Sequence, residues 1–317
     1  MPRIFFNLEF VDEGHRTEME GRLAVAASGS RQTKIALARG EADWVVSLLS
    51  SNLLAPAGDV FRAKLRDDFV WDAGDFPTGL DLGFYCSLPS ILFSPKIHRT
   101  FAYPVRYNEL VQPFDLEDAT RLYSFVGGIT SGIRARMAKT LSSIAPVTNG
   151  EFRVSPGPWN SMFDRSASTI KIAYADSLRR AKFILCPRGN GVASIRMFES
   201  MEAQRVPVVL SDHYVFPEGV DWKTCALVIR EKEIACLPEI IREAEPRWEK
   251  MAAAARRTWE GHFSNAVMLD EIARHLATLQ HARHWWAKPA CLALRTKMRA
   301  KQVLPGIINR LRLPHRP

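Results

Sequence analysis

The sequence predicts an α/β protein built on parallel sheets, and three observations support this prediction. Short apolar segments alternate with segments of helical periodicity along most of the 317 residues. Residues 182–210 contain a strand, a glycine turn, a helix and a second strand in succession, which is the order of one right-handed βαβ unit. The length and the 47% hydrophobic content suffice for two domains of ordinary size.

Apolar segments in the first half predict the strands of one α/β domain. The first strand is expected at residues 3–10, and the polar residues after it are expected to form a loop. The other strands are expected at 33–38, 43–49 (strand or helix), 68–71, 89–93 and 122–126. A helix is expected from residue 131 to about 144. Residues 146–158 are rich in Pro, Gly, Ser and Asn and are expected to form a linker or mobile loop.

The second half predicts another α/β unit around a buried central strand. A helix at 170–181 leads into an apolar strand at 183–186, which Pro187 ends. Helical spacing begins at about Ala193, and 206–210 is expected to form the next buried strand. The later elements expected are a strand at 226–229 and helices at 232–244, 248–262 and 266–286.

The turn at residues 187–191 has the composition of a ligand-binding loop. It follows a strand of a parallel sheet, and ligands bind at the carboxyl ends of such strands. Gly189 and Gly191 let the backbone turn tightly and let a ligand approach it closely. The following helix start suits phosphate, and Ser194 occupies the expected capping position.

Charged residues at the turn predict a site for a nucleoside diphosphate. Arg188 lies in the turn itself, and Arg196 and Glu199 are three residues apart on one helix face. A guanidinium group suits phosphate oxygens or a base edge, and a carboxylate suits ribose hydroxyls. The alternative is an ordinary surface ion pair between Arg196 and Glu199. The turn is also not the six-position dinucleotide fingerprint, so a nucleotide site remains a hypothesis on spacing alone.

The run CPRGNGVASIRMFESMEAQRVPVVLSDHYVFPEGVDW closely resembles the exostosin-type glycosyltransferases, an inverting family of GT-B architecture. The strong match covers about residues 177–241. The matching motifs are the turn Cys186–Gly189, the helix start Ser194-x-Arg196-x-x-Glu199, the strand Val206–Val209 and the loop Ser211–Pro217. The resemblance implies an α/β GT-B fold, in which two doubly wound Rossmann-like domains face each other across a cleft.

The resemblance also implies a division of labour between the parts of the chain. Residues 1–148 are expected to bind the acceptor, and residues 149–285 are expected to bind the nucleotide sugar. Residues 286–317 would form a basic C-terminal tail.

The resemblance implies a glycosyltransferase that moves a sugar, with inversion, from a UDP- or GDP-type donor to a hydroxyl of a glycan or glycolipid. No metal or other cofactor is expected: Glu41 and Asp43 have the spacing of an acid-x-acid metal motif but are expected to cap a helix or face solvent. The expected donor-binding residues are Arg188, Gly189, Gly191, Ser194, Arg196, Glu199 and Asp212. His213, beside Asp212, is a further candidate for contact with the donor sugar.

The catalytic base is expected to come from the first domain, across the cleft from the donor. Acidic residues and one histidine at the predicted strand ends are the candidates. They are Asp12, Glu13 and His15 after the first strand, and Asp72 and Asp75 after Trp71. Asp75 is preferred, because Trp71–Pro77 occupies the place where the family has a comparable aromatic and acidic turn.

The net charge of +9 is concentrated at the C-terminus. Residues 272–317 contain ten Lys or Arg and no acidic residue, whereas the rest of the chain is nearly neutral. Basic and apolar residues from 282 onward predict either contact with an anionic membrane surface or a helix packed on the first domain. A neutral body argues against a nucleic-acid partner.

Composition also predicts the cellular compartment. The five cysteines are scattered, with no metal or disulfide spacing. No stretch is apolar enough to cross a membrane, and the N-terminus lacks the pattern of a signal peptide. A cytoplasmic protein, peripheral on the inner face of the membrane, is therefore expected.

Two other functions remain open from the sequence. One is a different nucleotide-dependent enzyme on a similar sheet, such as a dehydrogenase, which binding of a nicotinamide cofactor would favour. The other is a non-catalytic, membrane-associated adaptor built on a degenerate transferase. The presence of Arg188, Arg196 and Glu199 argues against the adaptor.

Overall fold

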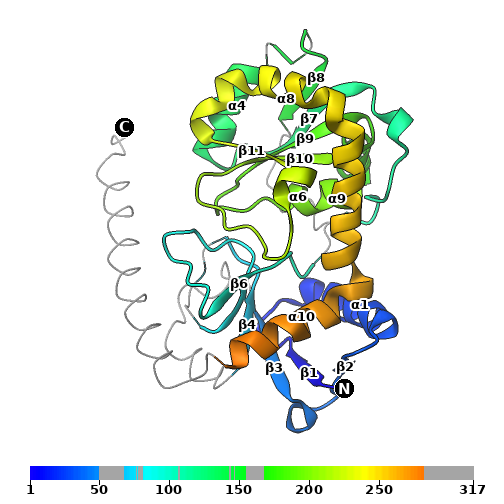
Figure 1. The fold of residues 1–317 in the computed structure, drawn as a ribbon, viewed down its shortest axis with the longest axis vertical. Coiled ribbons are helices and arrows are strands. Elements are labelled where there is room, and N and C mark those ends of the chain that lie inside the picture. The colour runs from blue at the N-terminus through cyan, green and yellow to red at the C-terminus, as the bar shows by residue number, and fades with distance from the viewer. Residues whose placement is uncertain are drawn as a thin grey trace, which may run out of the picture.

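The computed structural model describes residues 1–49, 68–75, 77, 81–105, 108–142, 144–145, 147–154 and 168–281. These residues form two lobes, each built on a parallel sheet and covered by helices (Figure 1). Residues 282–317 lie outside the described residues. They include the end of the helix expected at 266–286 and the expected basic tail. Among the described residues, no helix is both long and apolar enough to pass through a membrane.

The first lobe contains a sheet of six strands, all parallel, within the described part of the chain. In spatial order the strands are β2 (Lys34–Ile35), β1 (Arg3–Asn7), β3 (Trp44–Leu49), β4 (Phe69–Asp72), β5 (Gly83–Tyr85) and β6 (His98–Thr100). A 3-10 turn, η1 (Arg39–Glu41), precedes β3. Glu41, the first residue of the acid-x-acid pair with Asp43, is the last residue of this turn.

The polar segment after β1 is a helix start and not the expected loop. Asp12 precedes α1 (Glu13–Gly29), and its carboxylate accepts a hydrogen bond from the backbone N–H of His15 at 3.0 Å. The helix buries Met19, Leu23 and Ala26, a narrow apolar stripe on a largely polar segment. The weakness of that stripe explains why the sequence did not predict a helix here.

The expected strand at 89–93 is also wrong. These residues turn, with Leu92 N–H bonding to the carbonyl of Pro89 at 2.8 Å, and only Pro89 forms a β-bridge, to Tyr214 of the other lobe. Proline lacks the N–H that a central strand needs, so this apolar run cannot continue a sheet.

The second lobe contains a five-stranded parallel sheet within the described residues. In spatial order the strands are β11 (Leu227–Ile229), β10 (Val206–Leu210), β9 (Ala181–Pro187), β7 (Arg121–Gly127) and β8 (Gly150–Val154). The helices of the lobe are α4 (Gly132–Leu141), α5 (Ser168–Arg179), α6 (Arg196–Glu202), α7 (Trp222–Cys225), α8 (Leu237–Ala244) and α9 (Trp248–His262). The 3-10 turns are η2 (Leu116–Asp118), η4 (Glu231–Cys236) and η5 (Glu245–Arg247).

The second lobe begins near residue 115 rather than at 149. β7 pairs with both β8 and β9, and α4 packs in the core of the second sheet. The segment 150–154, expected in a linker, is the edge strand β8. The entry to the lobe is fixed by Arg205, which is fully buried and donates to the carbonyls of Phe114 and Asp115 at 3.2 and 2.8 Å.

The chain returns to the first lobe after α9. α10 (Asn265–Gln280) packs along α1, and the two helices lie side by side at the bottom of Figure 1. Polar contacts fix this packing: Arg22 donates to Asn265 at 3.1 Å, and Ser30 donates to Asp270 at 2.6 Å. The first lobe is therefore completed by the C-terminal part of the described chain.

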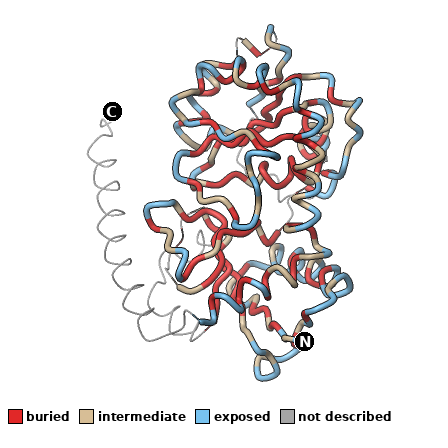
Figure 2. The backbone as a smooth tube through the Cα atoms, viewed as in Figure 1, coloured by how far each residue is buried: buried red, intermediate tan, exposed pale blue. Residues whose placement is uncertain are grey.

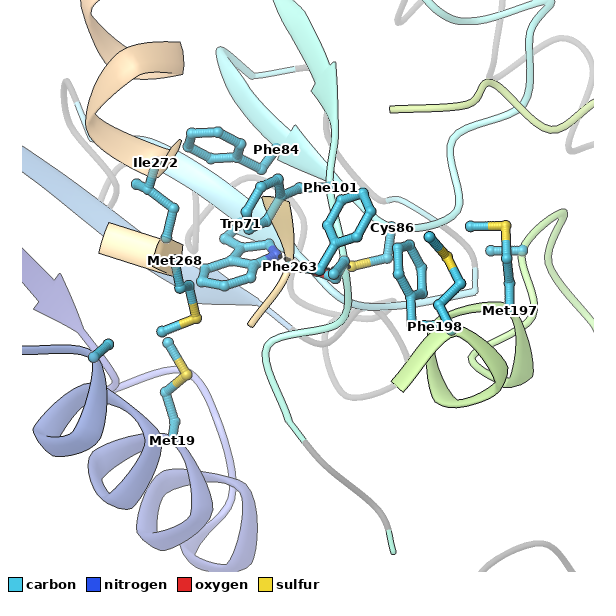
Figure 3. Close-up of a cluster of buried hydrophobic side chains, with 14 of the residues drawn as sticks. Met19, Trp71, Phe84, Cys86, Phe101, Met197, Phe198, Phe263, Met268 and Ile272 are labelled. Atoms are coloured by element: carbon cyan, nitrogen blue, oxygen red, sulfur yellow. Dashed lines mark hydrogen bonds between the residues drawn. The ribbon is translucent and has the colours of Figure 1, made fainter. Parts of the chain in front are cut away.

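One hydrophobic core extends from the first lobe into the second. Buried residues are concentrated in the two sheets and where the lobes meet (Figure 2). Edge-to-face aromatic contacts connect Trp71 of β4 to Phe101, Phe101 to Phe263, and Phe263 to Phe198 of α6 (Figure 3). Such contacts add to the apolar area that the rings bury and make the interface well packed.

Polar contacts join the loops that follow the strands of both sheets. The Ser87 hydroxyl, after β5, accepts from the N–H groups of Val192 and Ala193, after β9, at 2.9 and 3.2 Å. The N–H of Ser90 bonds to the carbonyl of His213, after β10, at 2.8 Å. The carboxyl ends of both sheets thus face each other, and two parallel α/β lobes in this arrangement confirm the predicted GT-B architecture.

We expect Gly191→Ala to destabilise the contact between the lobes. A Cβ at this position would lie 2.2 Å from Oγ of Ser87 and 2.7 Å from the carbonyl oxygen of Asp75, so the backbone of one lobe must move. Overpacking of this kind costs about 1–3 kcal/mol, and thermal denaturation should show a Tm lower by several degrees.

Gly189→Ala is the matched control for this substitution. The nearest atoms to its Cβ are Nη2 of Arg134 at 3.5 Å and Oγ1 of Thr130 at 3.6 Å, which is ordinary contact. Its Tm should equal that of the wild type. Equal losses in the two variants would contradict the close approach of the lobes at Gly191.

We expect His275 to make the fold sensitive to acid. Burial, and next the charge of Arg274, lowers the pKa of His275 from 6.5 to about 4. The neutral form is therefore favoured in the folded state, and this stability is present above about pH 6.5 and lost as the pH falls toward 4. His275→Phe keeps an aromatic ring against Phe84 and Phe101.

Urea unfolding at pH 7 and pH 5 measures this effect. The wild type should lose more stability between the two pH values than His275→Phe, by about 2 kcal/mol from linkage. Some acid sensitivity should remain, since burial also lowers the pKa of His98, to about 3. Identical losses in the two proteins would show that His275 is not held neutral.

Candidate functional site

The glycine turn lies at the centre of the loops that meet between the lobes. It follows β9, which is flanked by β10 and β7, so three strand ends of the second sheet lie next to one another. The N–H of Arg188 bonds to the carbonyl of Leu210 at 3.1 Å, and the N–H of Gly189 bonds to the carbonyl of Ala193 at 3.3 Å. The turn is therefore closed on itself and fixed to the neighbouring strand.

Arg134 of α4 holds this turn from within the second lobe. Its guanidinium group donates to three carbonyl oxygens: Gly128 at 3.1 Å, Pro187 at 3.3 Å and Arg188 at 3.2 Å. The residue is 4% exposed. Burial, and next the charge of Arg196, lowers the pKa of Arg134 to about 9.

The sequence did not single out Arg134 as a site residue. One signal was available: Arg134 lies at the start of α4, which follows the strand β7 and the glycine pair Gly127–Gly128. Because β7 is next to β9 in the same sheet, the start of α4 lies near the glycine turn.

Arg196 is buried at the start of α6, with 1% of its surface exposed. It donates to the carbonyl of Val126 at 3.0 Å, and its guanidinium carbon lies 5.1 Å from the ring centre of Phe125 and 5.6 Å from that of Tyr174. Gly127 leaves room for it, since a Cβ there would lie 2.2 Å from Nη2 of Arg196.

Glu199 lies one turn further along the same helix and is 5% exposed. The Tyr174 hydroxyl donates to its Oε2 at 2.5 Å. Burial, and next the charge of Glu199, raises the pKa of Tyr174 well above its ordinary value, so the tyrosine remains the donor. Because Arg196 and Glu199 are both buried, the alternative of an exposed surface ion pair is wrong.

Arg188 extends toward η4. Its Nε donates to Oε1 of Glu231 at 2.6 Å, and Arg136 donates to the other oxygen of the same carboxylate at 3.2 Å. Asp212 lies beside them, with its Oδ1 accepting from the N–H of Glu231 at 2.9 Å. The sequence did not predict Glu231, because the pairing joins residues 43 positions apart.

Ser194 is buried but does not cap the helix. α6 begins at Arg196 after Ile195, and no side-chain capping bond is present. Among the described residues, the Ser194 hydroxyl has no hydrogen-bond partner. The helix begins one residue later than a cap at Ser194 would require, so Ile195 occupies the capping position. Gly189 and Gly191 lie in the turn as predicted, and His213 contacts Ser90 of the first lobe.

Of the candidate bases, Asp75 is the one whose contacts reach the glycine turn. Its backbone lies against Gly191, where a Cβ would be 2.7 Å from the carbonyl oxygen of Asp75. Burial raises the pKa of the Asp75 carboxyl above the ordinary value, although the charge of Arg134 and polar interactions with Gly191 and Asn190 act in the opposite direction.

Asp12 and His15 form the cap of α1. His15 Nδ1 lies 2.5 Å from Oδ2 of Asp12. Burial acts to raise the pKa of Asp12, but the hydrogen bonds and charge of His15 outweigh it and lower that pKa. Glu13 is the first residue of the helix, and Asp72 ends β4, where its Oδ1 accepts from the N–H of Gly74 at 2.8 Å.

Comparison with known proteins finds similarity in the second lobe. The family model described as the Exostosin GT47 domain matches residues 115–244. The Exostosin-1 homolog of Caenorhabditis elegans is 31% identical over 105 residues, which are 32% of this chain and 28% of that protein. Exostosin-1b of Danio rerio is 33% identical over 105 residues, or 32% of this chain and 14% of that protein.

Two solved structures have a similar course of the chain. A glycosyltransferase from Rickettsia africae has a TM-score of 0.45 at 7% identity, covering 87% of this chain and 98% of that one. HepE of Anabaena, solved in complex with UDP, has a TM-score of 0.42 at 10% identity, covering 88% of this chain and 100% of that one.

The match to the family model begins shortly before β7 and ends at the last residue of α8. It therefore coincides with the second sheet and its loops. It contains the turn, Arg196 and Glu199, on which the resemblance found in the sequence was based, and it also contains Arg134. Residues 115–244 are therefore similar to the Exostosin GT47 domain, and this similarity covers the loops that meet the first lobe.

Proposed function

We propose that this protein is a glycosyltransferase that moves a sugar from a nucleotide-diphosphate donor to a hydroxyl of a glycan or glycolipid. In this proposal the second lobe binds the donor and the first lobe binds the acceptor. The transfer proceeds with inversion and without a metal ion. The chain covers only 28% of the length of the Caenorhabditis elegans relative, so the activity is argued from the residues of this chain.

The observation that carries the proposal is the gathering of cationic groups at the end of β9. Arg134 and Arg196 are both buried, and the charge of Arg196 contributes to lowering the pKa of Arg134. Two buried like charges near each other are unfavourable, and an anion bound beside them would relieve that cost. A diphosphate leaving group carries such charge and gains more during bond breaking, so the arginines would favour the transition state.

In the proposed reaction, the acceptor oxygen forms a bond to the anomeric carbon as the bond from that carbon to the diphosphate breaks. The electron pair of the broken bond stays on the diphosphate, where Arg188, Arg134 and Arg196 supply positive charge. The acceptor proton passes to a base on the first lobe. Attack from the face opposite the leaving group inverts the configuration.

Asp75 is our candidate for the base. It is contributed by the first lobe, it reaches the turn, and burial raises its pKa toward the range in which a carboxylate accepts a proton more readily. Asp12 and His15 are less suited, since each already serves as the partner of the other at the start of α1.

Two experiments separate this proposal from its rivals. A thermal-shift screen of nucleotide sugars should raise the Tm with at least one UDP- or GDP-sugar, whereas a nicotinamide cofactor should leave it unchanged. Stabilisation by the nicotinamide cofactor alone would favour a dehydrogenase. Donor binding without transfer to any glycan acceptor would favour the adaptor.

We expect Arg188→Ala to weaken donor binding by about tenfold or more in calorimetry, because a charge-assisted contact to phosphate is lost. The Tm should change little, since the Arg188 side chain is 29% exposed and Glu231 keeps its ion pair with Arg136. Arg136→Ala is the matched control: it removes the other arginine from Glu231 but lies outside the turn. Equal donor affinity in all three proteins would remove Arg188 from the donor site.

We expect Glu199→Gln to reduce discrimination for the ribose hydroxyls of the donor. Glutamine still offers an oxygen to the Tyr174 hydroxyl, so the local packing is retained, but the charge is lost. Calorimetry with UDP and 2′,3′-dideoxy-UDP measures how much the loss of the ribose hydroxyls weakens binding. The Kd for dideoxy-UDP divided by the Kd for UDP should be about ten times larger in the wild type than in the variant. The same ratio in both proteins would show that Glu199 does not contact the ribose.

A further inference from the structure

Residues of the first lobe occupy the backbone N–H groups of the glycine turn. The Ser87 hydroxyl accepts from the N–H of Val192 at 2.9 Å and from the N–H of Ala193 at 3.2 Å. The backbone of Asp75 lies against Gly191, where a Cβ would be 2.7 Å from the carbonyl oxygen of Asp75. Two successive N–H groups, at 192 and 193, are therefore bonded to an oxygen atom of the opposite lobe, and Asp75 covers the residue before them.

Successive backbone N–H groups that point to one side of a turn form a site for anionic oxygen. In this turn the Ser87 hydroxyl fills that position, and the backbone of Asp75 lies beside it. The fit is tight, because a Cβ on Gly191 would lie 2.2 Å from Oγ of Ser87 and 2.7 Å from the backbone carbonyl oxygen of Asp75.

Positive charge lies on the inner side of the same turn. Arg134 holds the carbonyls of Pro187 and Arg188, and its charge acts on Asp75. The turn thus has a buried guanidinium group behind it and a carboxylate in front of it. A carboxylate in this position resembles a phosphate in charge and in the oxygen atoms that it offers.

We propose that Asp75 and Ser87 form an internal plug, which fills the N–H groups of Val192 and Ala193 and covers Gly191 until the diphosphate of a donor displaces it. This inference rests on the proposed function and adds its regulation. Displacement would free the Asp75 carboxylate from the turn, so the candidate base would become available only after the donor has bound.

Ser87→Ala tests the plug, with inorganic pyrophosphate as the probe. Removal of the hydroxyl leaves two N–H groups open, so the Kd for pyrophosphate in calorimetry should fall about three- to tenfold. Ser90→Ala is the matched control, because its hydroxyl lies in the same loop and contacts His213 at 3.4 Å rather than the turn. Its Kd should equal that of the wild type.

Hydrogen exchange of the peptide covering residues 188–195 gives a second readout. Without ligand, this peptide should exchange faster in Ser87→Ala than in the wild type, and pyrophosphate should restore its protection. Asp75→Asn keeps the shape of the side chain but removes its charge, so it should also bind pyrophosphate more tightly. This variant serves as the test if Ser87→Ala does not fold.

An unchanged or weaker affinity of both variants would overturn the plug, because it would mean that Asp75 and Ser87 support the site instead of blocking it. Absence of pyrophosphate binding in the wild type and in both variants would overturn it as well. Failure of the proposed function has a different result: pyrophosphate would bind more tightly to the variants, but no nucleotide sugar would bind to any of the proteins.

Discussion

The functional edge of the second lobe depends on one buried guanidinium group. Arg134 binds three carbonyl oxygens at the ends of β7 and β9, and without it the oxygens of Gly128 and Pro187 would lose this donor, while that of Arg188 would keep the Ser131 hydroxyl at 3.0 Å. Unpaired buried polar groups cost about 1–3 kcal/mol each, so the turn would rearrange. The turn that Arg134 holds directs the N–H groups of Val192 and Ala193 toward the first lobe.

The sequence predicted the central part of the second lobe well, because its signals are local. The β9 strand, the glycine turn, α6 and β10 follow from two apolar runs, a proline and a change of period within thirty residues. The first lobe was harder to predict. β5 and β6 have three residues each, too few for a pattern, and α1 has only a narrow apolar face. The expected linker became β8 because pairing with β7 outweighs its turn-rich composition.

The candidate site shows the same division between local and distant information. The residues of the turn and Arg196 were found from their spacing, and Asp75 was placed next to the turn as expected for a residue across the interface. The partners of these residues were not predictable. Glu231 pairs with Arg188, Tyr174 with Glu199, and Ser87 with the turn, and each contact depends on how distant segments pack.

The return of α10 to the first lobe determines how this protein can be divided. A fragment that ended before residue 115 would contain the complete first sheet but would leave the apolar face of α1, including Met19, without its partner Met268 (Figure 3). The first lobe is thus discontinuous in sequence, and the second lobe is an insertion within it. An exchange of donor specificity between related proteins would have to replace this insertion and keep both ends of the recipient chain.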